Sequence, residues 1–440
     1  MNDEYRIRMK KIFKKIVVLL LTLEARAVLW RFRPTIVVVT GSVGKTATKD
    51  AIAAVLTGVV SVRKSPKSFN SEFGVPLTIL GIDESGWGSA VRWARILLRG
   101  AAAIFGAKRQ YPSFLVLEVG ADHPGDIRRI ARWVRPDCVV VTQFAETPVH
   151  LAFFPSREAL LAEKALLVQA LKKDGLLVVN ADDSDVRSLA KDTTARTITI
   201  GREKGADYSA PYAAIAYKGG DRFPEGIQAK IEYQGKMIPL FLRGTLGLHY
   251  VLSALAAVVV GSVYGVNILD AATRLGTLSF PAGRMKILHG ISGSIIIDDS
   301  YNASPVALHA ALTAMRELVV SGRKIALLGD MRELGEKSES EHIKAGKLAA
   351  ETIDYLFTVG TEAEKIGEGA RMGMDESHLR HFTTVEEAGA FLKGFLKDGD
   401  ALLVKGSQSM RLERAVAAVL LHPERRKDLL VRQDREWEDR

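Results

Sequence analysis

The stretch 35–56, TIVVVTGSVGKTATKDAIAAVL, constrains the fold of this chain more than any other. Its first six residues are β-branched or apolar, as in a buried strand, and its last twelve have the composition of a helix. A short turn bracketed by Gly41 and Gly44 joins the two. A strand, a glycine turn and a helix in immediate succession form the first half of a βαβ unit, so the chain is predicted to be an α/β protein.

The same alternation continues after this unit. Strand-like apolar runs recur at 114–120, 138–143 and 175–183, and a helical pattern covers 156–171. Strands that alternate with helices favour a mostly parallel sheet covered by helices. Residues 205–245 differ, because their short alternating runs predict antiparallel strands, and a helix is expected at 248–261.

A second α/β series begins after Pro281–Ala282–Gly283–Arg284. Its strand-like runs are KIALLGDM, YLFTVG, ALLVKGS and the start of SIIIDDSYNASP, which continues as a loop, and a helix is expected at 305–315. These signals divide the chain into an N-terminal helix (1–33), a central domain (34–282), a C-terminal α/β domain (283–421) and a charged tail (422–440). The tail is expected to be solvated.

Composition excludes several classes of protein. With 440 residues, 47% of them apolar and 25% charged, the chain matches a soluble protein of two or three domains. The single cysteine, Cys138, excludes an internal disulfide framework and a cysteine-rich zinc site. We expect a cytoplasmic protein.

Positive charge is concentrated at the N-terminus. Residues 1–33 hold nine Lys or Arg and three Asp or Glu, so they carry six of the ten net positive charges. Because the rest of the chain is nearly neutral and no nucleic-acid motif is present, we expect no nucleic-acid partner.

The apolar run 16–23 lies among these charges and is interrupted by Glu24 and Arg26. A spanning helix needs roughly 20 apolar residues, and this segment is shorter. A membrane span is the least favoured of three interpretations, and two others stay open on equal terms. The helix packs on the body of the protein, or it lies at the inner face of a membrane, with four lysines near anionic lipid: Lys10, Lys11, Lys14 and Lys15.

The glycine turn at 41–46 is suited to phosphate. A strand that ends in glycines before a helix turns successive N–H groups toward one point, where the helix dipole adds positive potential. Lys45 would reach the β- and γ-phosphates, and Thr46 would offer a hydroxyl to Mg²⁺. The loop is a short GxxGKT form, with Val39 where the longer motif has glycine.

Three further residues are candidates whose roles the residues alone do not settle. Glu118 ends a buried strand and is either a metal ligand at the sheet edge or a solvated carboxylate. His150 follows the third strand, where a lone histidine is usually structural. Lys164 lies in an apolar helix and, taken alone, is best interpreted as a surface lysine that snorkels.

Eight blocks in fixed order carry a resemblance. They are TGSVGKTATKD, NSEFGVPLTIL, LEVGADHPGDI, HLAFF with AEKALL, NADD, AGRM with IIDDSYNASP, LLGDMRELGE and LVKGS. Together they span about residues 34–420 and resemble the Mur ligase family, most closely the branch that adds D-alanyl-D-alanine. The resemblance implies a central P-loop ATPase domain with a mostly parallel sheet, a Rossmann-like C-terminal domain, and an ATP-dependent amide ligase that uses Mg²⁺ and acts through an acyl phosphate. Its substrates would be a peptidoglycan precursor and D-Ala-D-Ala.

The resemblance also implies site residues. The catalytic set would be Lys45, Glu118, His150 and Lys164, with Lys164 carbamylated. Metal ligands would be Thr46, Glu118, His150 and Lys164. Nucleotide contacts would come from Gly41, Ser42, Val43, Gly44, Lys45, Thr46, Ala47, Arg284, Asp299 and Asn302. Substrate contacts would come from Asn70, Lys405 and Ser407.

The sequence departs from the family pattern in two places. Tyr250 and Ser253 stand where asparagines are usual, so amide contacts to adenine are expected to be lost. Only about 33 residues precede the ATPase core, where the family has a UDP-binding domain. An alternative is therefore a Mur-type ligase or amidating enzyme that acts on another, lipid-linked carboxylate. The related amidating enzyme has a four-cysteine zinc site, which this chain lacks. A non-catalytic scaffold is disfavoured by the intact set of candidate residues.

Overall fold

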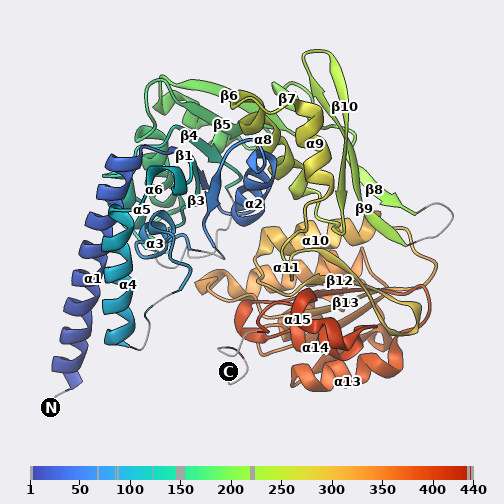
Figure 1. Ribbon diagram of the computed structural model, residues 1–440. Helices are drawn as coiled ribbons and strands as arrows, with labels where there is room; N and C mark the ends of the chain where they lie inside the picture. Colours follow the sequence, from blue (N-terminus) through green and yellow to red (C-terminus); the bar gives the residue numbers. More distant parts are fainter. Residues whose placement is uncertain are drawn as a thin grey trace. The chain divides into compact units, whose positions relative to one another are not determined.

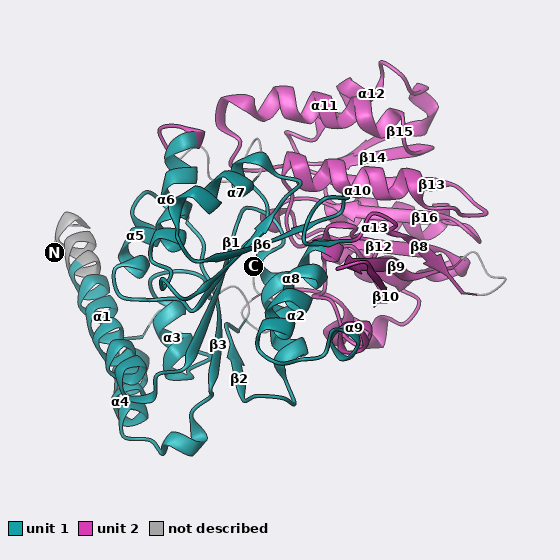
Figure 2. Cartoon of the chain, turned by 90° about the horizontal axis from the view of Figure 1, so that it is seen from above, with its two compact units in different colours: residues 1–144, 158–209, 252–271 teal, residues 145–157, 210–251, 272–440 magenta. Residues whose placement is uncertain are grey.

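The computed structural model describes residues 3–66, 69–84, 86, 89–121, 123–144, 154–218, 223–433 and 437, with side chains from residue 12 onward (Figure 1). The chain forms two compact units (Figure 2). Unit 1 comprises residues 1–144, 158–209 and 252–271, and unit 2 comprises residues 145–157, 210–251 and 272–440. The predicted α/β class, with a large mostly parallel sheet and a second sheet, is confirmed.

Unit 1 is built on seven parallel strands in the order β2-β3-β1-β4-β5-β6-β7. Their bounds are β1 Thr35–Thr40, β2 Val62–Lys64, β3 Phe114–Glu118, β4 Cys138–Val141, β5 Leu176–Asn180, β6 Arg196–Gly201 and β7 Tyr208–Ser209. Central strands β3, β4 and β5 are buried along their whole length, which explains their uninterrupted apolar sequences.

Helices cover this sheet. They are α1 Asp3–Phe32, α2 Lys45–Leu56, α3 Gly74–Leu80, α4 Ala90–Ile104, α5 Asp126–Ala131, α6 Arg157–Gln169 and α7 Ser184–Ser188, with short 3-10 helices at Lys108–Gln110 and Leu189–Asp192. Helices α8 (His249–Val263) and α9 (Ile268–Gly276) each pass from one unit to the other.

The basic N-terminal segment forms one helix, α1, which contacts α3 and α4. One side of α1 is buried through Val17, Leu21, Ala25 and Val28. The packed-helix interpretation therefore holds for this side of α1. Within the described part of the chain, no helix is both long enough and apolar enough to cross a membrane.

Unit 2 contains two sets of strands. Strands β8 (Ala214–Tyr217), β9 (Pro224–Tyr233) and β10 (Lys236–Arg243) pair antiparallel, as predicted. The second sheet has the order β11-β12-β16-β13-β14-β15 and is parallel except for β11. Its bounds are β11 Lys286–His289, β12 Ile295–Asp299, β13 Lys324–Gly329, β14 Tyr355–Val359, β15 Leu379–Phe382 and β16 Ala401–Lys405.

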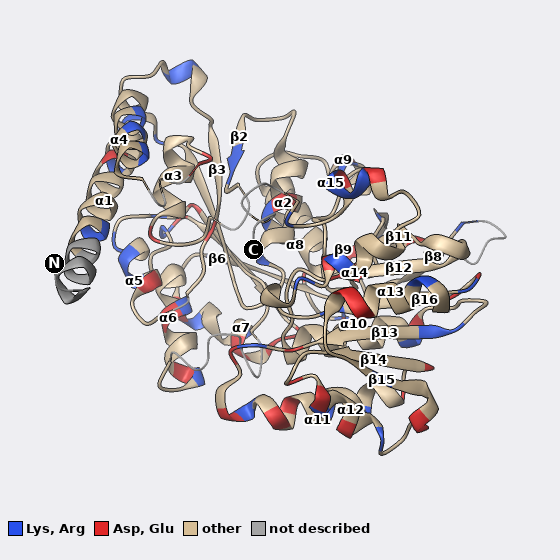
Figure 3. Ribbon diagram, turned by 90° about the horizontal axis from the view of Figure 1, so that it is seen from below, with Lys and Arg blue, Asp and Glu red and all other residues tan. Residues whose placement is uncertain are grey.

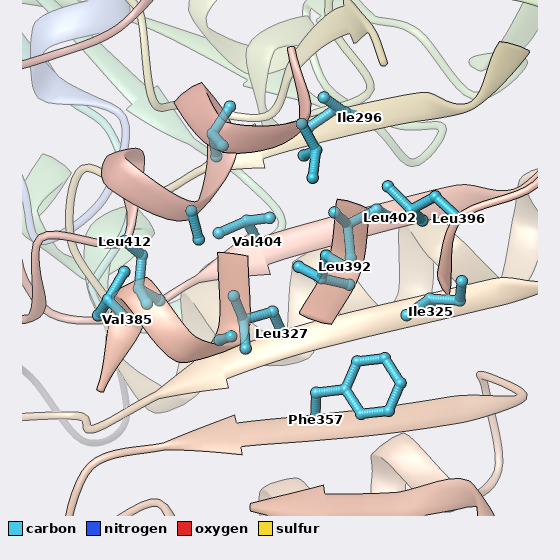
Figure 4. Close-up of a cluster of buried hydrophobic side chains, with 14 of the residues drawn as sticks. Ile296, Ile325, Leu327, Phe357, Val385, Leu392, Leu396, Leu402, Val404 and Leu412 are labelled. Carbon is cyan, nitrogen blue, oxygen red and sulfur yellow. The ribbon is translucent and has the colours of Figure 1, made fainter. Parts of the chain in front are cut away.

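The helices of unit 2 are α10 Pro305–Glu317, α11 Ser338–Ala350, α12 Glu364–Ala370, α13 Val385–Phe395, α14 Glu413–Val419 and α15 Arg426–Leu429. Short 3-10 helices lie at Ile291–Gly293, Gly335–Lys337, Glu376–His378, Gln408–Met410 and Pro423–Arg425. Leu327, Phe357 and Val404 from the sheet pack with Leu392 and Leu412 in one apolar cluster (Figure 4). This packing fixes the carboxyl ends of β12 and β16, where Asp299 and Lys405 lie.

The charged tail is less solvated than its sequence suggests. Residues 422–428 are exposed, but Leu430 is buried and the Arg432 guanidinium lies 2.7 Å from the buried Glu413 carboxylate. Arg432 also donates to the carbonyl of Ser300 at 3.3 Å. The expectation of a solvated tail is therefore wrong for this part, because one buried ion pair anchors it to unit 2.

Candidate functional site

The phosphate-type loop joins β1 to α2 in a conformation that requires its two glycines. Gly44 has a φ of 82° and precedes the first residue of α2, Lys45. Gly41 has a φ of 141°, and a Cβ there would lie 2.0 Å from the hydroxyl of Thr142. Backbone conformation therefore restricts both positions to glycine, and at Gly41 the lack of space for a side chain does so as well.

The end of β4 holds the loop in place. The Thr142 hydroxyl donates to the carbonyl of Val43 at 2.6 Å, and the Ser42 N–H donates to the carbonyl of Gln143 at 2.7 Å. The loop is thus fixed by a neighbouring strand of the same parallel sheet. A preorganised loop can bind an anion without first ordering its backbone.

Two loop residues point their polar groups to different partners. The Lys45 ammonium donates to the carbonyls of Gly41 at 3.0 Å and Ser42 at 3.2 Å. The hydroxyl of Thr46 donates to the Glu118 carboxylate at 3.0 Å. The next residue, Ala47, is buried under the loop.

Glu118, at the end of β3, is 2% exposed and lies among several polar groups. Besides Thr46, its carboxylate has the Asn70 amide nitrogen at 3.5 Å and the Lys49 ammonium at 3.9 Å. A carboxylate and a hydroxyl side by side are the oxygen donors that Mg²⁺ prefers. The two residues that sequence analysis assigned to metal from separate elements are therefore adjacent and chemically suited to Mg²⁺.

Lys49 was missed by the sequence analysis. It lies one helical turn after Lys45, is 1% exposed, and donates to the carbonyl of Ser65 at 2.8 Å. Burial lowers the pKa of Lys49, while the nearby carboxylates of Asp50 and Glu118 oppose this shift. Its spacing of four residues from Lys45, on one side of a helix that begins at the loop, is the signal that could have found it.

Lys164, on α6, is buried against the same loop. Its ammonium donates to the hydroxyl of Ser42 at 2.9 Å and lies 5.0 Å from the centre of the Phe144 ring. The interpretation of Lys164 as a snorkelling surface lysine is therefore wrong. His150, the remaining candidate ligand, lies outside the described residues.

The sequence candidates of the C-terminal domain form a second cluster, within unit 2. Asp299 and Lys405 are paired in register at the ends of β12 and β16. The Lys405 ammonium lies 2.7 Å from the Asp299 carboxylate and donates to the carbonyl of Asn302 at 2.9 Å. Burial raises the pKa of Asp299, although Lys405 opposes this shift.

Short contacts also surround this pair. The side-chain oxygen of Asn302 accepts from the Gln408 N–H at 3.3 Å. The hydroxyl of Ser407 accepts from the Arg332 N–H at 2.8 Å. The Arg284 guanidinium lies 4.1 Å from the centre of the Tyr301 ring. All five sequence candidates of this domain therefore lie in one neighbourhood.

The two unusual residues of α8 have structural partners. Tyr250 is buried, and its hydroxyl donates to the carbonyl of Arg284 at 2.8 Å. Ser253 accepts from the hydroxyl of Thr48 at 2.9 Å, one turn into the helix that follows the phosphate-type loop. Both replacements thus support segments that carry candidate site residues.

Comparison with known proteins identifies the family. The family model described as the Mur ligase middle domain matches residues 99–261, and that of the Mur ligase, glutamate ligase domain matches residues 283–408. A relative from Bacillus subtilis (strain 168), named UDP-N-acetylmuramoyl-tripeptide–D-alanyl-D-alanine ligase, is 31% identical over 400 residues, which cover 91% of this chain and 79% of the relative. The chain belongs to the Mur ligase family.

Further Mur ligases support this assignment. A relative of the same name from Mycobacterium tuberculosis (strain CDC 1551 / Oshkosh) is 32% identical over 412 residues, covering 88% of this chain and 73% of that protein. The crystal structure of MurF ligase from Thermotoga maritima in complex with ADP matches with a TM-score of 0.74 at 28% identity, covering 94% of this chain and 84% of that one.

The protein is therefore an ATP-dependent ligase of a family that needs Mg²⁺. The predicted family, class of enzyme and use of ATP are confirmed. The assignment of individual residues to metal, nucleotide or substrate stays a prediction, for which the two clusters supply the geometry.

Proposed function

We propose that this Mur ligase joins D-alanyl-D-alanine to the terminal carboxylate of a UDP-linked muramoyl tripeptide, the reaction that the names of its relatives describe. The observation that carries the proposal is the convergence of Lys45, Thr46, Glu118 and Lys164 on one glycine loop. This set supplies the positive charge and oxygen ligands that phosphoryl transfer requires.

The chemistry follows from the poor reactivity of a carboxylate. A carboxylate oxygen attacks the γ-phosphorus of ATP, ADP leaves, and an acyl phosphate forms. The amine nitrogen of the dipeptide then attacks the acyl carbon, the C–O bond to phosphate breaks, and the nitrogen loses its proton. The products are the amide, ADP and inorganic phosphate.

Unit 1 residues have distinct roles in this proposal. Loop N–H groups of residues 41–47 bind phosphate oxygens, and Lys45 neutralises charge that develops on the transferred group. Thr46 and Glu118 would hold Mg²⁺, together with His150, and the metal when bound offsets the charge on the phosphates. Asn70, which lies beside Glu118, would orient the substrate carboxylate.

Lys164 would act after carbamylation. Its neutral amine adds to CO₂ and loses a proton, which converts a cationic side chain into an anionic oxygen donor. Burial against Ser42 supports this role, because the product would lie at the phosphate loop beside the metal ligands.

The C-terminal domain would complete the site. We propose that residues 34–282 form the ATP-binding domain and residues 283–421 the domain that closes on it. Arg284, Asp299 and Asn302 would contact the nucleotide, and Lys405 and Ser407 would lie near the incoming amine. Their common neighbourhood at the ends of β12 and β16 supports this grouping.

A second candidate substrate is a lipid-linked carboxylate. The exposed apolar residues of α1, including Ile16, Leu19 and Trp30, favour it, because they would bring the enzyme to a membrane surface. We propose peripheral contact of residues 1–33 with the inner face of the membrane.

One assay separates these substrates. Purified protein with ATP, Mg²⁺ and D-Ala-D-Ala is offered UDP-linked tripeptide or lipid-linked precursor, and both phosphate release and product mass are followed. Amide formed only on the UDP-linked tripeptide supports the first proposal, and amide only on the lipid-linked precursor supports the second. Phosphate release without amide on either acceptor would overturn both.

A further inference from the structure

Helix α1 has an apolar face that is exposed in the part of the chain that the structure describes. Its buried side is formed by Val17, Leu21, Ala25 and Val28. At 100° per residue, a second apolar stripe lies on the opposite side. This stripe consists of Ile12, Ile16, Leu19, Leu23 and Trp30, whose exposed fractions range from 43% to 77%.

The neighbouring helix α4 repeats this arrangement. Trp93, Ile96 and Gly100 face inward. Val91, Leu98 and the C-cap residue Phe105 recur every seven residues and are 71%, 72% and 81% exposed. Recurrence at seven residues places the three side chains along one line of the helix.

The two helices are packed against each other. A Cβ at Gly100 of α4 would lie 2.1 Å from the Glu24 carboxylate of α1, so glycine permits close approach at this point. Near the other end of the contact, the Lys14 ammonium lies 3.0 Å from the Glu72 carboxylate, just before α3. The two exposed stripes therefore belong to one structural element, the α1–α4 pair (Figure 1).

The net positive charge of the chain is concentrated in the two sequence segments that contain this pair of helices. Residues 89–110 contain five Lys or Arg and no Asp or Glu, and residues 1–33 carry a net charge of +6. Together these segments hold eleven net positive charges, one more than the whole chain, so the remaining residues carry −1. Figure 3 marks the Lys and Arg residues of α4 and of the described part of α1.

We propose that α1 and α4 together form a surface that binds an anionic bilayer. This inference rests on the proposed membrane contact of residues 1–33 and extends it to a second helix. Exposed apolar side chains enter the boundary between headgroups and acyl chains, while lysine and arginine beside them attract anionic headgroups. Arg92 and Arg95 lie exposed on α4 in positions to do so.

A second copy of this chain fits the surface less well. Such a contact would bring two surfaces of about the same strong positive charge together, and like charges oppose association. An anionic lipid surface is complementary to both the charge and the apolar side chains. Binding is expected to be reversible and to weaken with salt, because surface charges are screened.

Vesicle co-sedimentation of the full chain tests the role of α4. Phosphatidylcholine vesicles with and without phosphatidylglycerol are compared for three proteins: the unaltered chain, a Leu98→Ser/Phe105→Ser double variant, and a Met372→Ser control. Met372 is 70% exposed in unit 2 and matches the altered residues in exposure. We expect the double variant to partition at least about tenfold more weakly onto anionic vesicles, and the control to bind like the unaltered chain.

A charge variant supplies an independent measurement. Arg95→Ser should weaken anionic-vesicle binding about fivefold and reduce its salt dependence. ATP-dependent ligation of soluble substrate in the absence of vesicles reports on the proposed catalytic function separately, and it should be unchanged in all variants because none touches the phosphate loop.

Several outcomes would overturn the inference. Equal binding of the double variant and the unaltered chain would restrict the contact to residues 1–33. Negligible binding of the unaltered chain would overturn the membrane contact altogether, whatever the ligation assay shows. Concentration-dependent dimers that disappear in the double variant, without vesicle binding, would assign the surface to a second copy of the chain.

Discussion

The phosphate-loop cluster of unit 1 and the Asp299–Lys405 cluster of unit 2 are alike in position and unlike in their bonding. Each lies at the carboxyl ends of parallel strands, where ligand sites of open α/β sheets form. In unit 1, the contacts of Glu118 with Thr46, Asn70 and Lys49 measure 3.0, 3.5 and 3.9 Å. In unit 2, Lys405 is bonded to Asp299 and Asn302 at 2.7 and 2.9 Å.

This difference in bonding predicts which property a substitution in each cluster will affect. The Lys45 ammonium donates to the carbonyls of Gly41 and Ser42 in its own loop, and such bonds can be exchanged for bonds to phosphate oxygens at small cost. Lys405 neutralises the buried Asp299 carboxylate at 2.7 Å, and removing it would leave that charge without its ion-pair partner. Substitutions should therefore reduce turnover in the first cluster and stability in the second.

The largest effect is expected for Lys45→Ala. Loss of this cation should reduce ATP turnover about 10³–10⁵-fold, because it offsets charge that develops during phosphoryl transfer. Thermal unfolding should change little, since the Lys45 ammonium donates to the carbonyls of Gly41 and Ser42 within its own loop and pairs no buried charge through these bonds. Steady-state phosphate release and thermal denaturation measure the two quantities. Lys173→Ala, at an exposed position after α6, is the control, and near-normal turnover of Lys45→Ala would contradict the prediction.

Lys405→Met tests the other side of the comparison. Breaking a buried ion pair on one side typically costs about 3–5 kcal/mol, so the free energy of unfolding should fall by this amount. Urea unfolding followed by fluorescence or circular dichroism measures it. A double variant, Lys405→Met with Asp299→Leu, should recover part of the loss because no buried charge remains. If Lys405→Met kept its full free energy of unfolding and lost turnover instead, the proposed contrast between a catalytic cluster and a stabilising cluster would be wrong.

Lys164→Ala is expected to reduce turnover about 10–100-fold, as loss of support for a metal site does. Bicarbonate should not restore activity, because the amine that would be carbamylated is absent, whereas short carboxylic acids should restore part of it. Rescue is measured as phosphate release against acid concentration. Equal responses of Lys164→Ala and Lys45→Ala to these acids would argue against a carbamate at position 164.

The sequence predicted the elements whose signals are local. The run before Gly41 and the alanine-rich run after Gly44 define β1 and α2 without any other part of the chain. Contacts across the fold were not accessible in this way. Lys164 lies 122 residues from Ser42 along the chain, so only the family resemblance pointed to its place. Lys49 was missed because its burial depends on Ser65 and Glu118 from other segments.

The same distinction between local signals and contacts across the fold applies to surface features. The charge of residues 1–33 is visible in the sequence, but which side of a helix is covered depends on its neighbours. The apolar stripe of α4 was therefore not predicted, although Val91, Leu98 and Phe105 are evenly spaced. The pairing of Arg432 with Glu413 was hidden for the same reason, since a charged segment by itself predicts solvation.

The smallest expected effect concerns Glu24. One of its carboxyl oxygens is buried and has no counterpart, among the described residues, of the Lys405 ammonium that pairs with Asp299. Oε2 of Glu24 has no hydrogen bond within the described structure, and burial raises the pKa of this group to about 7. Because the pKa is raised on folding, the folded state is favoured when Glu24 is protonated. That contribution is complete below the ordinary value of 4.5 and is lost as pH rises toward 7.

Glu24→Gln should remove this dependence. The variant should match the unaltered chain in free energy of unfolding near pH 4.5 and exceed it by about 1 kcal/mol at pH 8, a value reduced for partial exposure of the side chain. Urea unfolding at the two pH values measures the difference. Lys405→Met should show no comparable gain at high pH, because its loss comes from an unpaired charge that persists there. Parallel pH profiles of the free energy of unfolding for Glu24→Gln and the unaltered chain would contradict the prediction. They would show that the Glu24 carboxylate reaches water or a partner, as the paired Asp299 carboxylate does.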